Sequence, residues 1–429
     1  SASQTFTITV NPTTNVTSFD DQFIFTGDTT ESVTIESVTE NATFTWTAVA
    51  ESGIEGLVNT SGSTNIIPEE TLALAEGINT PLDVVYTITP SAPGDQVCPG
   101  NPYTYTVTVN PITGVTLVED IVVCHDDDVE EIVFTSTVEG GVTTYEWAAS
   151  GDSIGLTQTD DGSGVINLFT AQNTTSEPLM SSITVTPTLT NGGVSSVGDP
   201  LTFTITVNPT AQVDEVVSQV LCNNESTDAI NFSTENSGGT TTYAWTNNNT
   251  NIGLGASGDG NIPSFTAIAG TTSETATIVV TPTFTNNDVQ CTGPTETFTI
   301  IVNPTAQVNE VASQVLCNTE STDAINFSTE NLDGTTTYAW TNDNTATGLE
   351  ASGNGNIPSF TATAGTSPEV STITVTPTYT NNEISCTGPT ETFTITVNPT
   401  AQMGEVPDYV FCNGEEIIDE INFTTVNSG

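Results

Sequence analysis

Apolar residues and threonines alternate with a period of two in several stretches of this chain. The clearest is Thr392-Phe393-Thr394-Ile395-Thr396-Val397-Asn398-Pro399. A period of two is typical of a β-strand with one buried and one wet face, and the proline ends it because proline lacks the N–H that a ladder needs. Near copies of this stretch lie at residues 5–12, 104–111, 202–209 and 297–304. The recurrence indicates a tandem repeat.

The closing prolines of these stretches lie 99, 98, 95 and 95 residues apart, which is the size of one small β-sandwich domain. We expect residues 1–12 to be the last strand of a preceding repeat and residues 400–429 the opening strands of a following one. A start at Ser1 without an apolar leader fits an interior segment of a longer repeat protein. The complete repeats are predicted at residues 13–111 (repeat 1), 112–209 (repeat 2), 210–304 (repeat 3) and 305–399 (repeat 4).

Repeats 3 and 4 align without a gap and give a template for the strands. Tyr243 and Trp245 lie two residues apart, so both are expected to point to one face and fill the centre of the sandwich. The pattern predicts an all-β fold of tandem immunoglobulin-like sandwiches with antiparallel sheets, stacked end to end as a rod. In repeat 3 the expected elements are a first strand reaching Cys222, strands at 229–234, around 243–245, at 262–267, 275–285 and 295–302, and a hairpin loop at 286–294.

The charge of the chain is one-sided, because it has no Lys or Arg, 52 Asp and Glu, and one His. Nucleic acids and anionic membrane surfaces are excluded as partners, since binding either requires cations on the protein. Surface salt bridges between acids and Lys or Arg are also impossible, so stability must come from the core, the backbone, covalent links or bound metal. A high net charge, here −52, is also typical of disordered chains. The strand periodicity and the one Trp in each repeat favour a folded chain instead.

Acidic residues cluster in three places, at Asp20-Asp21, at Asp160-Asp161 and at His125-Asp126-Asp127-Asp128 with Glu130-Glu131. Calcium prefers oxygen ligands and would relieve the repulsion between adjacent carboxylates. The third cluster therefore predicts a calcium site made by Asp126, Asp127, Asp128 and Glu130, although the spacing of an EF-hand loop is absent. The alternative is a solvated turn, and apart from calcium the sequence calls for no cofactor.

The seven cysteines occupy two positions in the repeat. Four lie 13 residues after a closing proline and form the early site, and three lie 13 residues before one and form the late site. Repeat 1 has Phe25 at the early site, and repeat 2 has Ser196 at the late site. If the early site of one repeat pairs with the late site of the next, Phe25 and Ser196 occupy partner positions, and every cysteine has a cysteine partner either in this chain or beyond its ends. Other pairings leave a cysteine opposite Phe25 or Ser196. The early cysteines are Cys124, Cys222, Cys317 and Cys412, and the late ones are Cys98, Cys291 and Cys386.

Topology favours the same pairing. In an immunoglobulin-like sandwich the turn after the first strand lies where the chain leaves, and the last hairpin lies where it enters. The two sites within one repeat then stand roughly 30 Å apart, but a disulfide tolerates a Cα separation of only about 7 Å. We therefore predict disulfides Cys124–Cys291 and Cys222–Cys386, with Cys98, Cys317 and Cys412 pairing beyond this segment. Buried free thiols and metal ligation are the alternatives, and oxidised cysteines would place the protein outside the cytosol.

Several runs of repeat 4 resemble a known family. The run from Tyr338 to Asn344, then Gly348-Leu349, Gly355-Asn356-Ile357-Pro358, Thr374-Val375-Thr376-Pro377 and the closing strand are similar to the PKD-like, immunoglobulin-like tandem repeats of Bacteroidota surface proteins. This resemblance implies type IX secretion, a cell-surface or extracellular location, and a stalk or filament role such as that of gliding-motility adhesins. Asp28-Thr29-Thr30 and Asp152-Ser153-Ile154 resemble the O-glycosylation sequon of that group, which points to Thr29 and Ser153.

The sequence offers little for catalysis, since a nucleophile, a base and an oxyanion group cannot be assembled from one His without Lys or Arg. We expect no enzyme, but the stiff shaft of a bacterial cell-surface adhesin or extracellular filament. Its partners would be neighbouring repeats of the same chain, like chains in a filament, and surface glycans. The alternative is a set of glycan- or protein-binding modules that use the loops at 247–251 and 342–344. Aromatic residues near those loops are expected to be buried, which favours the shaft.

Overall fold

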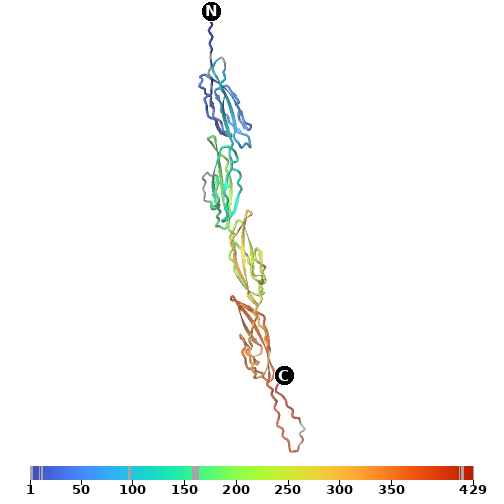
Figure 1. Ribbon diagram of the computed structural model, residues 1–429. Coiled ribbons are helices and arrows are strands. Elements are labelled where there is room, and N and C mark those ends of the chain that lie inside the picture. Colours follow the sequence, from blue (N-terminus) through green and yellow to red (C-terminus); the bar gives the residue numbers. More distant parts are fainter. Residues whose placement is uncertain are drawn as a thin grey trace. The chain divides into compact units, whose positions relative to one another are not determined.

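A computed structural model of the chain describes residues 3–8, 10, 13–94, 98–156, 164–414, 416 and 420–428 (Figure 1). Contacts divide the chain into two compact units. The first contains Ser1–Thr210, Ser237–Gly239 and Thr285–Cys291, and the second contains Ala211–Asn236, Thr240–Phe284 and Thr292–Gly429. A turn and a hairpin tip of repeat 3 therefore belong to the same unit as repeats 1 and 2. Asp160 and Asp161 lie outside the described residues.

Repeat 1 is built on one five-stranded sheet with the strand order β1-β9-β8-β3-β5. Two short ladders, β2 with β6 and β4 with β7, form the opposite layer. The strands are β1 (Gln22–Phe25), β2 (Val33–Thr34), β3 (Thr43–Ala50), β4 (Ile54–Glu55), β5 (Ser61–Gly62), β6 (Ile66–Ile67), β7 (Ala73–Leu74), β8 (Leu82–Ser91) and β9 (Tyr103–Asn110).

Repeat 2 repeats this plan, with the sheet order β10-β18-β16-β13 and β17 paired to β16. Its opposite layer again consists of two short ladders, β11 with β15 and β12 with β14. The strands are β10 (Ile121–Cys124), β11 (Asp128–Val129), β12 (Ile132–Val133), β13 (Val142–Gly151), β14 (Val165–Ile166), β15 (Phe169–Thr170), β16 (Leu179–Asn191), β17 (Val194–Val197) and β18 (Leu201–Asn208).

Repeats 3 and 4 share one arrangement, with sheet orders β19-β24-β22-β20-β21 and β25-β30-β28-β26-β27. β23 and β29 form hairpins with β22 and β28. The elements are β19 (Gln219–Cys222), β20 (Thr240–Asn247), η1 (Thr250–Ile252), β21 (Ser257–Asp259), β22 (Glu274–Asn286), β23 (Val289–Thr292) and β24 (Glu296–Asn303), then β25 (Gln314–Cys317), β26 (Thr335–Asn342), η2 (Thr345–Thr347), β27 (Ser352–Asn354), β28 (Glu369–Asn381), β29 (Ile384–Thr387) and β30 (Glu391–Asn398).

The all-β, immunoglobulin-like fold is as predicted, but the strands differ from expectation in three respects. The first strand of each repeat has four residues and runs parallel to the last strand, since both lead from the entry end to the exit end. Residues 229–234 and 262–267 form no strands, and they are joined by the isolated bridge Ile230↔Ile262, beside which lies the bridge Ser226↔Thr266. The expected hairpin loop at 286–294 instead contains β23.

Each repeat encloses its own hydrophobic core, and the tryptophan of each aromatic pair lies in it as predicted, whereas Tyr243 and Tyr338 are half-buried and pack against it. Trp46, Trp147, Trp245 and Trp340 are at most 7% exposed. The glycine-rich run of repeat 3 packs directly against the core, because a Cβ at Gly258 would overlap the indole ring of Trp245. Glycine permits this close approach of the backbone to a large ring.

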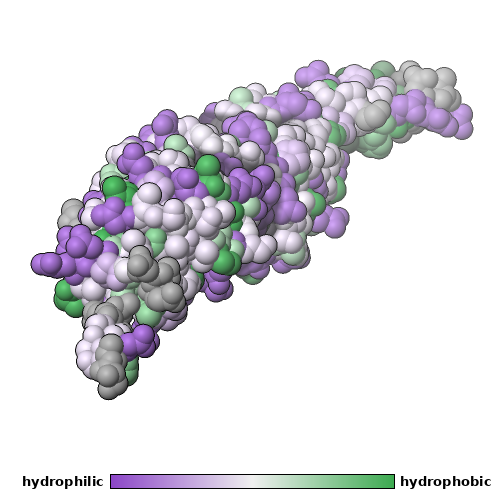
Figure 2. All heavy atoms as spheres, turned by 90° about the horizontal axis from the view of Figure 1, so that it is seen from above, coloured by the Kyte–Doolittle hydropathy of each residue, from purple (hydrophilic) through white to green (hydrophobic). Residues whose placement is uncertain are grey.

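The outer face of the main sheets carries the threonines. In β30 every second residue from Phe393 to Val397 is buried, and the threonines between them are exposed or half-buried. On the face seen in Figure 2, hydrophilic and near-neutral residues cover most of the surface, with hydrophobic residues scattered between them. The described part of the chain contains no helix with the length and hydrophobicity of a membrane span.

Candidate functional site: the junctions between repeats

Strand register brings the early cysteine and the closing asparagine together in repeats 2, 3 and 4. In repeat 3, Cys222 at the end of β19 lies opposite Asn303 at the end of β24. The same register pairs Cys124 with Asn208 and Cys317 with Asn398. Because the two strands are parallel, both residues stand at the exit end of the repeat. A repeat therefore presents a thiol and a carboxamide side by side to whatever follows it.

An acidic residue three positions after the early site fixes the backbone of that site. In repeat 3 the Cys222 N–H donates to Glu225 Oε2 at 2.8 Å, and the Glu225 N–H donates to the Cys222 carbonyl at 3.1 Å. The chain turns sharply between them, since Asn224 has a φ of 69°. The acceptors of the equivalent bonds are Asp28, Asp127 and Glu320. This turn is present in all four repeats and holds the first strand at the exit end.

A tight hairpin at the entry end supplies the other half of the junction. The two central residues of the turn have positive φ in each of repeats 2 to 4, which is typical of the type I′ turn of two-residue hairpins. An asparagine ends the strand before the turn, and the late site follows it by five residues. The central pairs are Gly192-Gly193, Asn287-Asp288 and Asn382-Glu383.

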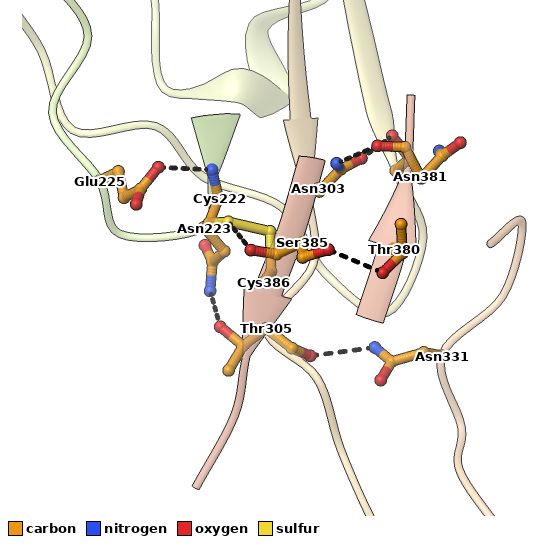
Figure 3. The surroundings of a disulfide bond; sticks show 11 residues. Cys222, Asn223, Glu225, Asn303, Thr305, Asn331, Thr380, Asn381, Ser385 and Cys386 are labelled. Atoms are coloured by element: carbon orange, nitrogen blue, oxygen red, sulfur yellow. Dashed lines mark hydrogen bonds between the residues drawn. A yellow bond between two sulfur atoms is a disulfide. The ribbon is translucent and has the colours of Figure 1, made fainter. Parts of the chain in front are cut away.

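Two disulfides join the early site of one repeat to the late site of the next. Cys124 is bonded to Cys291 with their Cα atoms 5.5 Å apart, and Cys222 to Cys386 with 5.6 Å (Figure 3). These are the two pairs that the spacing predicts. The late cysteines are buried, at 3% and 1% exposure. The thiol of Cys317 is free and exposed, in the position that Cys124 and Cys222 occupy in their repeats. Cys98 and Cys412 are also exposed, and pairing of these three beyond the segment stays a prediction.

Beside each disulfide, two asparagines of successive repeats meet. Asn286 Nδ2 donates to Asn208 Oδ1 at 2.9 Å, and Asn303 Nδ2 donates to the Asn381 carbonyl at 2.9 Å (Figure 3). Asn208 and Asn303 are completely buried. A buried amide that loses its partner destabilises the protein by about 1–3 kcal/mol. The asparagine of the Asn-Pro motif therefore has two roles, because it ends the last strand of its repeat and also forms a hydrogen bond with the next repeat.

A third contact joins the repeats away from the disulfide. The Ser237 N–H donates to the Ser176 carbonyl at 2.9 Å, and its hydroxyl donates to Glu177 Oε1 at 2.8 Å. Between repeats 3 and 4, the Leu332 N–H donates to the Thr271 carbonyl at 3.0 Å. The disulfide, the asparagine contact and this backbone bond are three separate points of attachment.

The junction between repeats 1 and 2 lacks the disulfide but keeps the other two contacts. Asn191 Nδ2 donates to Asn110 Oδ1 at 2.7 Å, and the Glu139 N–H donates to the Asn79 carbonyl at 2.8 Å. An aromatic contact lies near the missing bridge, because a Cβ at Gly192 would overlap the ring of Phe23. The backbone of this hairpin turn therefore lies directly against the aromatic ring.

The three aspartates of the acidic cluster in repeat 2 accept hydrogen bonds from three different groups. Asp127 accepts from the Cys124 N–H at 3.1 Å, Asp128 from the Thr170 hydroxyl at 2.8 Å, and Asp126 from Gln172 Nε2 at 3.0 Å. Each of these three aspartates thus has its own partner. Among the described residues, no three His, Cys, Asp or Glu are placed to hold a metal ion. A calcium site made by Asp126, Asp127, Asp128 and Glu130 stays a prediction, and the separate partners of the three aspartates favour the alternative of a solvated turn.

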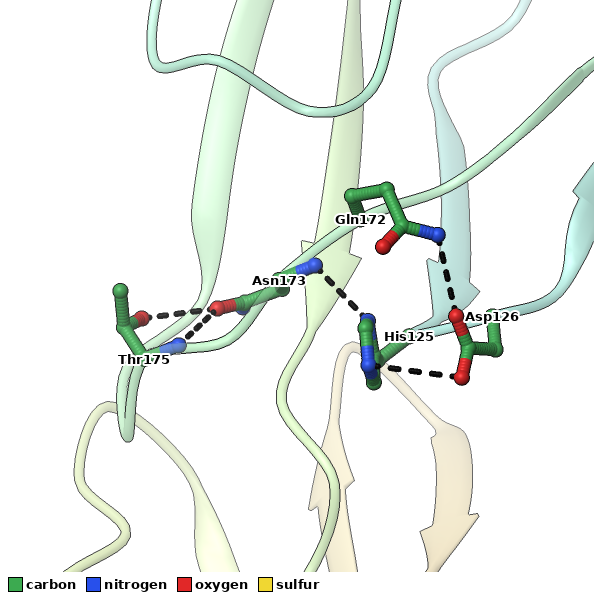
Figure 4. A network of polar contacts seen from close by, with 5 residues as sticks. All are labelled: His125, Asp126, Gln172, Asn173 and Thr175. Carbon is green, nitrogen blue, oxygen red and sulfur yellow. Dashed lines mark hydrogen bonds and ion pairs between the residues drawn. The ribbon is translucent and has the colours of Figure 1, made fainter.

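The single histidine supports a loop beside the junction. His125 Nδ1 accepts from the Asn173 N–H at 2.9 Å, and its Nε2 lies 3.5 Å from Asp126 Oδ2 (Figure 4). In repeats 3 and 4 the equivalent residues, Asn223 and Asn318, accept from loop N–H groups in the same way. The imidazole therefore replaces an asparagine as a structural acceptor.

The amides of Asn247 and Asn249 in one loop, and of Asn342 and Asn344 in the other, are bonded within their own repeats. Asn247, at 7% exposure, donates to the carbonyls of Leu254 and Gly255, and its Oδ1 accepts from the Asn249 N–H. Asn249 caps η1 and donates to Glu274. Asn342 and Asn344 make the equivalent bonds in repeat 4. These side chains hold their own loops.

The two residues of the glycosylation motif are exposed. Thr29 shares a hydrogen bond of 2.8 Å with the Thr71 hydroxyl, and Ser153 lies in a loop after β13. Modification at either residue stays a prediction.

The surroundings of a few titratable groups shift their pKa values. Burial, together with the charge of Glu70, raises the pKa of Tyr86 to about 12, and burial also raises the pKa of Tyr105. The Thr204 N–H, 2.7 Å from Oδ1, lowers the pKa of Asp120. Asp120 directly precedes β10 and attaches it to β18, so this carboxylate helps to place the strand that ends in Cys124.

Comparisons with known proteins agree with the repeat type. Residues 21–113 match the model of the PKD-like domain family. No protein with a curated function matches the chain. A similar solved structure is the human desmocollin-1 ectodomain, with 10% identity and a TM-score of 0.32, which covers 92% of this chain and 83% of that chain. Drosophila N-cadherin EC1-4 has 12% identity and a TM-score of 0.29, with 89% of this chain and 99% of that chain covered. Mouse cadherin-23 EC22-24 has 10% identity and a TM-score of 0.30, with 69% of this chain and 100% of that chain covered. Repeat 1 is thus similar to PKD-like domains.

Proposed function

We propose that this segment is part of the stiff shaft of a bacterial cell-surface adhesin or extracellular filament. The observation that carries the proposal is that both disulfides join different repeats rather than the two layers of one sandwich. A disulfide within a repeat would stabilise that repeat alone, but a disulfide between repeats restricts their relative motion. The resemblance to Bacteroidota surface repeats favours an exported protein, and oxidised cysteines suit an extracellular location.

The charge of the chain supports a role outside the cell and away from anionic surfaces. With 52 acidic residues and no Lys or Arg, copies of this segment repel one another at long range, which keeps a protruding shaft soluble. The partners that we propose are the neighbouring repeats of the same chain, with Cys317 bonded to the late-site cysteine of a following repeat. A module that binds glycans through its asparagine loops is less well supported, because the amides of Asn247 and Asn249 already hold their own loop.

Imaging of native cells tests this function. Antibodies against this segment, detected by electron microscopy, should label thin surface filaments with an axial period of about 40 Å, which is a strand length plus a linker. Thiol labelling of the unreduced protein should leave Cys124, Cys222, Cys291 and Cys386 unmodified. Label confined to the cytoplasm, or four reactive thiols in freshly isolated protein, would contradict the proposal.

A further inference from the structure

The spans of the two disulfides overlap along the chain. The Cys124–Cys291 span covers 167 residues and the Cys222–Cys386 span covers 164, whereas the repeats are 95 to 98 residues long at these positions. A span that is longer than the period must overlap the next one. Here the overlap extends from Cys222 to Cys291, which is most of repeat 3.

We infer that this overlap keeps the chain in one covalent piece after backbone cleavage anywhere between Cys124 and Cys386. A cut before Cys222 is bridged by Cys124–Cys291, and a cut after Cys291 is bridged by Cys222–Cys386. A cut between them is bridged by both disulfides. The inference concerns covalent integrity and does not depend on the proposed shaft.

Two simultaneous cuts distinguish overlapping spans from separate ones. If one cut falls between Cys124 and Cys222 and the other between Cys291 and Cys386, the middle fragment retains Cys222 and Cys291. It is then bonded through Cys291 to the first fragment and through Cys222 to the last. All three fragments stay joined. This property protects an exposed chain in surroundings that contain proteases.

The absence of Lys and Arg permits a clean experiment, since trypsin finds no site in the natural chain. Three equivalent loop positions precede the first strand of repeats 2, 3 and 4, namely Leu117, Glu215 and Glu310. All three are exposed, and each is followed by valine, so a lysine at each creates one site in a matched context. Position 117 lies outside both spans, 215 lies in the first span only, and 310 lies in the second only.

The oxidised variants Leu117→Lys, Glu215→Lys and Glu310→Lys are digested with trypsin in a denaturant that preserves disulfides, which makes each site accessible. Electrophoresis without reductant should show one intact band for Glu215→Lys and Glu310→Lys, and two fragments for Leu117→Lys. With reductant, all three should give two fragments. The double variant Glu215→Lys/Glu310→Lys should remain one band without reductant and give three fragments with it.

Cysteine replacements supply the control for each bridge. Adding Cys124→Ser and Cys291→Ser to Glu215→Lys should release two fragments without reductant, whereas adding Cys222→Ser and Cys386→Ser should leave one band. Separation of the Glu215→Lys or Glu310→Lys fragments without reductant would overturn the inference. Loss of one fragment from the double variant would overturn the overlap.

Discussion

Pulling the chain from its two ends should reveal how the disulfides shorten its covalent path. Without disulfides, Cys124 and Cys386 are separated by 262 residues, which extend to about 940 Å at roughly 3.6 Å per residue. With both disulfides, the shortest covalent path runs from Cys291 back to Cys222 and contains 69 residues, or about 250 Å. Reduction should therefore lengthen the fully extended molecule by about 690 Å.

Single-molecule force spectroscopy with and without reductant measures this difference. Removing only the Cys222–Cys386 pair should leave a path of 95 residues, about 340 Å, and removing only the Cys124–Cys291 pair should leave 98 residues, about 350 Å. A gain of only about 90 to 100 Å for each single pair, with a much larger gain when both are lost, is the signature of overlapping spans. Equal full extension of oxidised and reduced molecules would refute the reasoning.

Four further outcomes are expected. In the chain-entropy model, loss of either disulfide should destabilise the protein by about 5 kcal/mol, because each closes a loop of more than 160 residues, and calorimetry of the Cys222→Ser/Cys386→Ser variant checks this. Asn208→Ala should lower the free energy of unfolding by about 1–3 kcal/mol, whereas Asn398→Ala, at the equivalent but exposed position, should change it little; equal losses would contradict the junction contact. Calcium titration should release no heat, since the carboxylates of Asp126, Asp127 and Asp128 have separate partners, and a saturable heat that disappears in Asp126→Asn would contradict that geometry. The melting temperature should be higher near pH 5 than near pH 8, because protonation reduces repulsion among the carboxylates. It should fall above pH 10, because the raised pKa of Tyr86 means that the folded protein favours the neutral hydroxyl of this residue. A Tyr86→Phe variant that shows the same loss of melting temperature at alkaline pH would contradict this role.

The sequence predicts most of the architecture because the repeat makes each signal appear several times. The closing strands, the buried tryptophans and the disulfide pairs follow from residues that recur at fixed spacing, such as Cys124, Cys222 and Cys386. The parallel pairing of the first strand could not be predicted in this way, since alternation shows which face is buried but not which strand lies alongside. The second layer of repeat 3 is less regular than expected, because Ile230 and Ser226 form isolated bridges there in place of strands.

The junction contacts were harder to anticipate than the disulfides. The Asn-Pro motif indicates a strand end, and the binding of Asn208 to Asn286 becomes visible only when two repeats are placed together. A signal was nevertheless present, because an acidic residue follows every early site by three positions and an asparagine precedes every late site of repeats 2 to 4 by five. The acidic cluster at Asp126 also contains a part of this pattern, since one of its carboxylates, Asp127, is the acidic residue of that turn.

Electron microscopy of single molecules tests the stiffness of the junctions most directly. The angle between neighbouring repeats is measured at each junction in oxidised and in reduced protein. We predict narrow distributions between repeats 2 and 3 and between repeats 3 and 4 that broaden on reduction, and a broader distribution between repeats 1 and 2 that reduction leaves unchanged. Equally broad angles at all three junctions in the oxidised protein, or no change on reduction, would contradict a shaft stiffened by disulfides between repeats.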